Sequence, residues 1–281
     1  MVSQRPENFR LNIGLSLANG LVLAGLSALP GTTHYHDSSL HSRHGELSNL
    51  NETQRWLWSD EIGRFYNRYY GAQQVLLSNA LDVPTLPVTI MVIAQNNGAG
   101  WERVFSSSSL NPSGCYIHGT YVQFASGGTK VEIGASCSDT LEYQFNSYQT
   151  SSDTIVANKW YTIIARINSM RNMEVFVDGV KVSGSPNYTG WVYGGGTGSA
   201  RIGALMYNTT VYYGYVRVSD VLMWGRALAD EEVDTLSNIT DRSLGGLLLP
   251  PKRKYYAITY HPTTARFLFL KQNNKFLSFT K

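Results

Sequence analysis

The stretch from Lys159 to Leu236 restricts the possible folds more than any other part of this sequence. Short runs of alternating apolar and polar residues, at 160–166, 173–177 and 214–224, are typical of half-buried β-strands. Asp178-Gly179 follows one run, and Asp-Gly is a favoured dipeptide in tight hairpin turns. The acids of 230–232 begin a helical segment, because negative side chains stabilise a helix N-terminus. The pattern predicts antiparallel strands followed by one short helix.

The rest of the chain extends this pattern. Residues 21–23 are predicted to form the first core strand, and the continuously apolar run 88–94 is typical of a central strand in a sandwich. A spacing of about ten residues between strands is typical of all-β sandwiches. Further strands are predicted at 75–77, 103–105, 116–117, 121–125, 130–134 and 141–145.

The C-terminal segment differs from the rest in charge. Residues 252–281 contain seven basic residues and no acid, and they follow Pro250-Pro251. Alternation restarts there at 255–260, 266–270 and 275–280, which predicts a small three-stranded meander. Such a unit is marginal alone, so we expect it to pack on its own sandwich or on another subunit. The expected docking residues are Lys252, Arg253, Lys254, Tyr255, Tyr256, Phe267 and Phe269. Because the charges bracket apolar strands, nucleic-acid binding is not expected.

A series of residues falls in order on a known motif. They are Trp160, Asp178, Gly179, Arg201, Ile202, Gly203, Gly214, Asp220, Arg226, Ala227, Leu228 and Glu232, with Gly20-Leu21-Val22, Asp37-Ser38-Ser39 and His44-Gly45 upstream. On these residues the chain resembles the laminin-G-like, concanavalin A-like family over about residues 18–240. The resemblance implies an all-β fold, a two-sheet antiparallel jelly-roll sandwich with one short helix and a C-terminal β appendage. The expected organisation is an N-terminal arm at 1–17, the jelly roll at 18–246 and the appendage at 247–281.

Several motif residues have expected structural roles. Asp178-Gly179 supplies a positive-φ turn, and Gly203 and Gly214 suit close backbone approach or bulges. Trp160 is expected to anchor the core, and Arg226 to pack or pair near the short helix.

The resemblance raises the question of catalysis, because the same fold houses glycoside hydrolases. A retaining enzyme needs two carboxylates about 5–5.5 Å apart. On one strand such a pair takes alternating positions, as in Glu-x-Asp-x-x-Glu. The closest match, from Glu232 and Asp234 to Ser237, lacks the final acid and falls on the predicted helix, and the acids between 103 and 161 occur singly. These are Glu132, Asp139, Glu142 and Asp153. We therefore predict a non-catalytic protein.

The glycine-rich loop 187–198 is the first candidate for recognition. Trp191 and Tyr193 offer flat faces for a sugar ring or a partner side chain, and the loop glycines allow adaptation. Tyr207, Tyr212 and Tyr213 are expected to join this ligand-binding set. The alternative is a loop that packs on its own sandwich.

The histidines and cysteines are candidates for a metal site and a disulfide. His34 and His36 would share a strand face and, with Asp37, offer ligands for a divalent metal. The alternative is a polar loop in which His44 packs as the resemblance implies. Calcium sites on rim loops occur in the family, but no dense Asp/Asn cluster supports one, so no cofactor is predicted. Cys115 and Cys137 either form a disulfide or act as small apolar residues.

Location and partners follow from the N-terminus and the resemblance. Asn12 and Asn19 interrupt the apolar stretch 11–29, so neither an export signal nor membrane insertion is expected. Single laminin-G-like domains with short arms are common among tailed-phage structural proteins. This implies a virion surface component, either a capsid decoration or a fibre or tail protein, assembled in host cytoplasm. Its expected partners are other virion proteins or its own copies, and cell-surface glycans. An extracellular bacterial lectin-like adhesin and a glycan-active enzyme remain as alternatives.

Overall fold

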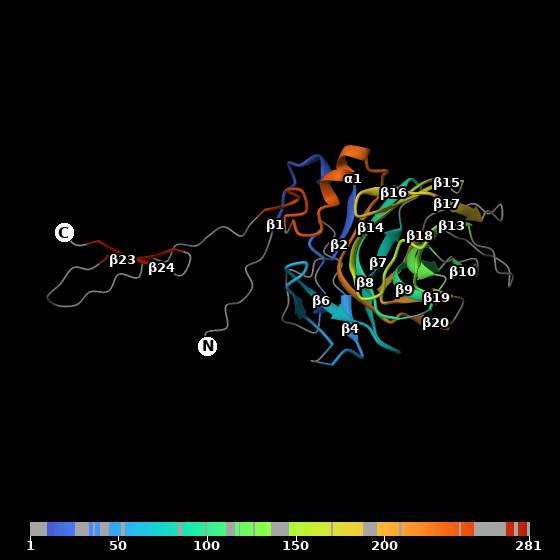
Figure 1. Cartoon of the computed structure of the whole chain (residues 1–281), viewed down its shortest axis with the longest axis horizontal. Coiled ribbons are helices and arrows are strands. Elements are labelled where there is room, and N and C mark those ends of the chain that lie inside the picture. Colours follow the sequence, from blue (N-terminus) through green and yellow to red (C-terminus); the bar gives the residue numbers. More distant parts are fainter. Residues whose placement is uncertain are drawn as a thin grey trace. The chain divides into compact units, whose positions relative to one another are not determined.

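The computed structural model divides the chain into two units, Met1–Leu249 and Pro250–Lys281 (Figure 1). It describes residues 10–25, 34–35, 37–39, 45–51, 54–83, 86–98, 100–110, 116–117, 119–125, 127–135, 146–169, 171–187, 196–207, 210–241, 243–249, 268–272 and 275–279. The predicted strand at 141–145 and the first strand of the predicted C-terminal meander lie outside these residues.

Two antiparallel sheets form the first unit. We call one the inner sheet; its described strands are β2 (Leu21–Gly25), β5 (Leu57–Ser59), β6 (Arg64–Arg68), β8 (Val88–Asn96), β14 (Trp160–Ser169), β15 (Asn172–Val177), β16 (Val180–Val182) and β21 (Val216–Trp224). They follow the order β16-β15-β14-β8-β21-β6-β5, and β2 also pairs with β21.

We call the other the outer sheet. Its described strands are β3 (His34–Tyr35), β4 (Gly45–Ser48), β7 (Gln74–Val83), β9 (Glu102–Leu110), β10 (Tyr116–Ile117), β11 (Thr120–Ala125), β12 (Lys130–Ala135), β13 (Asn146–Thr150), β17 (Gly184–Asn187) and β18 (Gly196–Ile202). They follow the order β17-β13-β12-β11-β9-β18-β7-β4-β3, with β10 beside β9.

Smaller elements complete the described chain. They are the strand pairs β1 (Arg10–Leu11) with β22 (Leu248–Leu249) and β19 (Ala204–Tyr207) with β20 (Thr210–Tyr213), the 3-10 turn Ser16–Ala18, and helix α1 (Asp230–Leu236). In the second unit, β23 (Leu268–Gln272) pairs with β24 (Lys275–Phe279). The predicted all-β, two-sheet jelly-roll sandwich with one short helix is confirmed. No helix in the described part of the chain is long and apolar enough to span a membrane.

The inner sheet is covered on both faces, which explains the continuously apolar run in β8. Ile90 and Val92 belong to the core between the two sheets. Met91 and Ile93 belong to a second core on the opposite face of the inner sheet, closed by α1 and neighbouring segments. Successive strand residues point to opposite faces, so a strand buried on both faces loses the alternation of polar and apolar positions.

Both ends of the first unit contribute to this second core. Leu17, Leu247 and Leu248 are buried in it, and β1 pairs with β22. Residues 10–17, predicted above as part of an arm, and 247–249, predicted as the start of the appendage, therefore lie within the first unit. The physical reason is that their apolar side chains cover the second face of the inner sheet.

The structural roles expected for the motif residues are confirmed. Asp178 and Gly179 have φ values of 49° and 82° and connect β15 to β16. A Cβ on Gly214 would lie 2.4 Å from the Arg103 carbonyl oxygen, so a side chain there would clash. Trp160 is buried in the second core. Arg226 donates to both carboxylate oxygens of Glu232, at 2.6 and 2.7 Å, and these bonds lower the pKa of Glu232.

Candidate ligand-binding pocket

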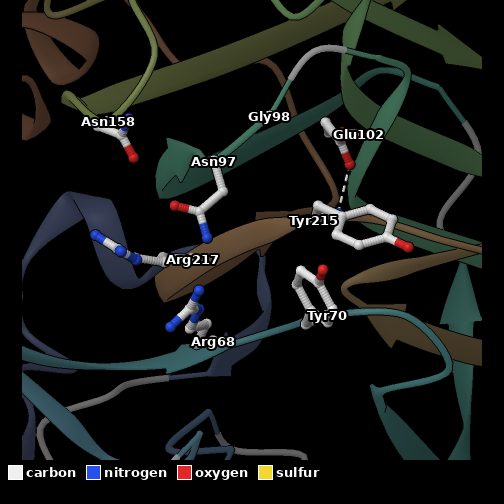
Figure 2. Close-up of a pocket in the computed structure, with 8 residues that line it drawn as sticks. All are labelled: Arg68, Tyr70, Asn97, Gly98, Glu102, Asn158, Tyr215 and Arg217. Carbon is white, nitrogen blue, oxygen red and sulfur yellow. Dashed lines mark hydrogen bonds between the residues drawn. The ribbon is translucent and has the colours of Figure 1, made fainter.

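A pocket of about 500 Å³ lies where the inner and outer sheets are joined by loops (Figure 2). Five segments meet there: the end of β6, the β8–β9 connection, the start of β9, the residue pair before β14 and the start of β21. The lining residues are Arg68, Tyr70, Asn97, Gly98, Glu102, Asn158, Tyr215 and Arg217. Seven of the eight carry a charged group, an amide or a phenol ring, so the cavity is suited to a small polar ligand.

Two arginines form one side of the pocket. Arg68 and Arg217 are directly opposite each other in the β6–β21 register, and Figure 2 shows both side chains on the same side of the pocket. The Arg217 guanidinium donates to the side-chain oxygen of Gln95, and Gln95 donates to the Asn158 carbonyl oxygen at 2.7 Å. It also lies 5.9 Å from the ring centre of Tyr66, within the range of a cation–π contact. These contacts fix Arg217 at the pocket wall.

An acid and two tyrosines form the other side (Figure 2). Glu102 is only 5% exposed, and its carboxylate accepts the backbone N–H of Tyr215. The rings of Tyr70 and Tyr215 pack edge to face with centres 4.6 Å apart. They remain 57% and 41% exposed, respectively. A ligand in the pocket would thus meet cations on one side and an exposed aromatic pair on the other.

The loops around the pocket are held by backbone contacts. The Asn97 N–H donates to the Tyr215 carbonyl oxygen at 3.2 Å, and the Asn158 N–H donates to the Asn96 carbonyl oxygen at 2.8 Å. Asn158 has a φ of 63°, a conformation that asparagine adopts more readily than most residues. A Cβ on Gly98 would lie 3.2 Å from a carboxylate oxygen of Glu102, so glycine permits this close approach. The pocket is therefore built before a ligand arrives.

A second polar cluster lies on the face of the outer sheet that points away from the core between the sheets. Arg103, Gln123 and Glu132 occupy one row across β9, β11 and β12. Glu132 accepts hydrogen bonds from the Tyr121 hydroxyl at 2.7 Å and from Gln123 at 3.0 Å. Burial raises the pKa of Glu132 and lowers the pKa of Arg103. The exposed Tyr212 ring centre lies 6.0 Å from the Arg103 guanidinium.

Among the described acids considered for catalysis, Glu132, Glu232 and Asp153 have partners other than a second carboxylate. The two hydrogen-bond partners that the structure gives Glu132 are neutral side chains. Glu232 and Asp234 lie on α1, as predicted, and Glu232 pairs with Arg226. Asp153 accepts from the Thr129 hydroxyl at 2.7 Å, whereas Asp139 and Glu142 lie outside the described residues.

The predicted ligand-binding residues are only partly described. Tyr212 is exposed and Tyr213 is half-buried in β20, and Tyr207 lies opposite Thr210 in β19. Trp191 and Tyr193 lie outside the described residues. The structure places Tyr215, two residues beyond Tyr213, in the pocket.

The predicted docking and metal sites are also only partly described. Of the predicted docking residues, Phe269 is described, and it lies opposite Ser278 in the β23–β24 pair. Asp37 is buried and accepts the backbone N–H groups of Ala24 and Ser39, both at 2.8 Å, so it stabilises its loop. Within the described ranges, no three metal-ligating side chains gather. The docking residues Lys252, Arg253, Lys254, Tyr255, Tyr256 and Phe267, together with His36, His44, Cys115 and Cys137, lie outside them.

Comparison with known proteins agrees with this architecture. The family model described as the Concanavalin A-like lectin/glucanases superfamily, a laminin-G model, matches residues 71–234. No curated protein sequence matches significantly. Among solved structures, Trypanosoma rangeli sialidase in complex with sialic acid is 15% identical with a TM-score of 0.51, covering 80% of this chain and 34% of that one. The receptor-binding domain of botulinum neurotoxin D is 11% identical with a TM-score of 0.51, covering 79% of this chain and 53% of that one.

These similarities differ in what they establish. The chain spans about a third of the sialidase and about half of the toxin domain, and at these identities the likeness is one of fold. The family match covers more than half of the chain and includes β8, β9, β14 and β21, which carry or border the pocket. This protein belongs to the laminin-G branch of the concanavalin A-like lectin/glucanase superfamily.

Proposed function

We propose that this protein is a non-catalytic carbohydrate-binding module and that the pocket at Arg68–Arg217 holds its ligand. The observation that carries the proposal is the exposed Tyr70–Tyr215 pair beside the polar groups of Asn97 and Glu102. Aromatic rings pack against the C–H faces of sugars, while amides and carboxylates hydrogen-bond with their hydroxyls. The lectin/glucanase family, and the similar sialidase that was solved in complex with sialic acid, support this class of ligand.

Replacing Tyr70 by alanine is expected to weaken glycan binding about fivefold to tenfold. The exposed ring supplies contact area in the pocket, and loss of about 1 kcal/mol of aromatic contact corresponds to such a change. The wild-type chain and the Tyr70→Ala variant are compared on a glycan array, and the strongest ligand is then titrated by calorimetry. We expect that ligand to be recovered uncleaved, as shown by an assay of reducing ends.

Trp58→Ala is the matched control, because Trp58 is also an exposed aromatic residue but does not line the pocket. It is expected to bind as the wild type does. An array without any bound glycan, with or without calcium, would contradict the proposed function. Equal binding by Tyr70→Ala and the wild type would move the site elsewhere, with the loop around Trp191 as the next candidate.

We further propose that the module is displayed on a virion, as a capsid decoration or a fibre or tail protein, and is mounted through residues 251–281. The support is the basic composition of this segment, its β23–β24 pair, and the resemblance to single-domain phage structural proteins. A bacterial extracellular lectin-like adhesin is the alternative.

Deleting residues 251–281 is expected to abolish incorporation into particles while leaving the first unit folded, because Met1–Leu249 forms its own unit. Incorporation is measured by copurification with particles, and folding by circular dichroism and thermal melting of the truncated chain. A truncated protein that still enters particles at the wild-type level would reject the docking role.

A further inference from the structure

We propose that the pocket selects saccharides that carry a carboxylate and that Arg68 and Arg217 bind this group. The inference rests on the proposed carbohydrate function and specifies the chemical class of its ligand. It concerns a part of the site that the sequence pattern did not single out.

The pocket wall pairs two like charges on neighbouring strands. Arg68 and Arg217 face each other across β6 and β21, and like charges directly opposite in a sheet are destabilising. Among the described residues, neither arginine forms an ion pair with a carboxylate. Other arginines of the same unit do: Arg64 with Asp220, Arg166 with Glu174 and Asp230, and Arg226 with Glu232. The pocket is therefore a site where an anionic ligand would compensate a pair of charges that the protein leaves uncompensated.

The Arg217 guanidinium is held in place before a ligand binds. One terminal nitrogen of Arg217 donates to Gln95, which is itself bonded to the Asn158 carbonyl, and the guanidinium lies over Tyr66. Its buried Nε–H has no hydrogen-bond partner among the described residues, so we expect a ligand to meet the terminal nitrogens of the group. A guanidinium held in place loses little freedom on binding, and its planar set of donors matches a carboxylate.

The two sides of the cavity carry groups of opposite charge. Glu102 lies on the side opposite the arginines, beside Tyr215 (Figure 2). Its negative charge disfavours a second carboxylate on that side, so a sugar acid is held in one orientation. The acid group then meets Arg68 and Arg217, while the ring and its hydroxyls meet Tyr215 and Glu102. A neutral sugar would leave both guanidinium groups without an anion.

The test uses the full chain and three sugar acids with their methyl esters: D-glucuronate, D-galacturonate and N-acetylneuraminate. Binding is measured by ligand-detected NMR titration at constant ionic strength. We expect at least one acid to bind about tenfold more tightly than its ester, since charge-assisted hydrogen bonds are roughly twice as strong as neutral ones. Arg217→Gln and Arg68→Gln are expected to lose this preference and to bind acid and ester equally.

Lys159→Gln is the matched control, because it removes one positive charge from a residue next to Asn158 that does not line the pocket. It should keep the preference for the acid. Arg68→Gln should also melt at the wild-type temperature or above it, since the repulsion between opposed arginines is relieved. A lost preference then reflects lost recognition and not unfolding.

The other outcomes overturn the inference in distinguishable ways. If acid and ester bind equally to the wild type, the saccharide site stands but its selection of carboxylates is rejected. If acetate or sulfate at equal concentration competes as well as the sugar acid, the arginines form a general anion site and no saccharide is selected. If the six monosaccharide probes and every glycan on the array fail to bind, the carbohydrate function itself is rejected, and this inference with it.

Discussion

Replacing Asp220 by alanine is expected to lower the free energy of unfolding by about 3–5 kcal/mol. Asp220 and Arg64 form an ion pair of 2.9 Å, and their side chains are 0% and 3% exposed. Removing the carboxylate takes the ion-pair partner away from a buried guanidinium, which is the costly way to break a buried pair. Arg64 also donates to the Asp241 carbonyl oxygen at 2.6 Å, and the partly buried Asp241 carboxylate interacts with its charge, but no ion pair within 4 Å replaces the one to Asp220 among the described residues. Urea unfolding followed by tryptophan fluorescence measures the change.

Two controls separate this mechanism from a general loss of packing. The double variant Arg64→Met/Asp220→Leu is expected to be more stable than Asp220→Ala, because it removes both charges together. Asp230→Ala breaks the contact of Arg166 with a carboxylate that is 75% exposed, and it should cost less than about 1 kcal/mol. If Asp220→Ala costs no more than Asp230→Ala, the buried pair is not a principal support of the fold.

The sequence predicts the strand framework well because the signals are local. The Asp178-Gly179 turn and the acids before α1 depend on a few adjacent residues, and they act as predicted. The apolar run in β8 is likewise a local signal of a strand buried on both faces. It does not reveal what covers the second face, since Leu17 and Leu247 come from opposite ends of the unit. That information lies in long-range packing.

The pocket is harder to predict for the same reason. Arg68, Glu102 and Arg217 come from separate segments, and only the strand register brings the two arginines opposite each other. Tyr212 and Tyr213, which the sequence analysis predicts to bind a ligand, lie within three residues of the pocket residue Tyr215. In isolation, however, an arginine on an alternating strand has the pattern of a solvated surface residue. The position of two arginines opposite each other on neighbouring strands distinguishes this site from an ordinary solvated surface.

Replacing Trp224 by alanine is expected to destabilise the first unit by about 3–5 kcal/mol. Trp224 is fully buried in the second core, and large-to-small substitutions of buried tryptophan leave a cavity of high cost. Its indole N–H also donates to the Leu17 carbonyl oxygen at 2.7 Å, so the residue fixes the N-terminal segment on the inner sheet. Thermal and urea unfolding measure the loss, and limited proteolysis should show new cleavage near residues 10–19.

Trp224→Phe separates the two contributions. It retains much of the apolar volume but removes the indole N–H, and a buried acceptor left without its donor costs about 1–3 kcal/mol. We expect intermediate stability for this variant, with cleavage near Leu17 still increased. If Trp224→Ala remained as stable and as resistant to protease as the wild type, residues 10–17 would not be held by the inner sheet. The first unit would then begin at residue 18, where the sequence pattern places the start of the jelly roll.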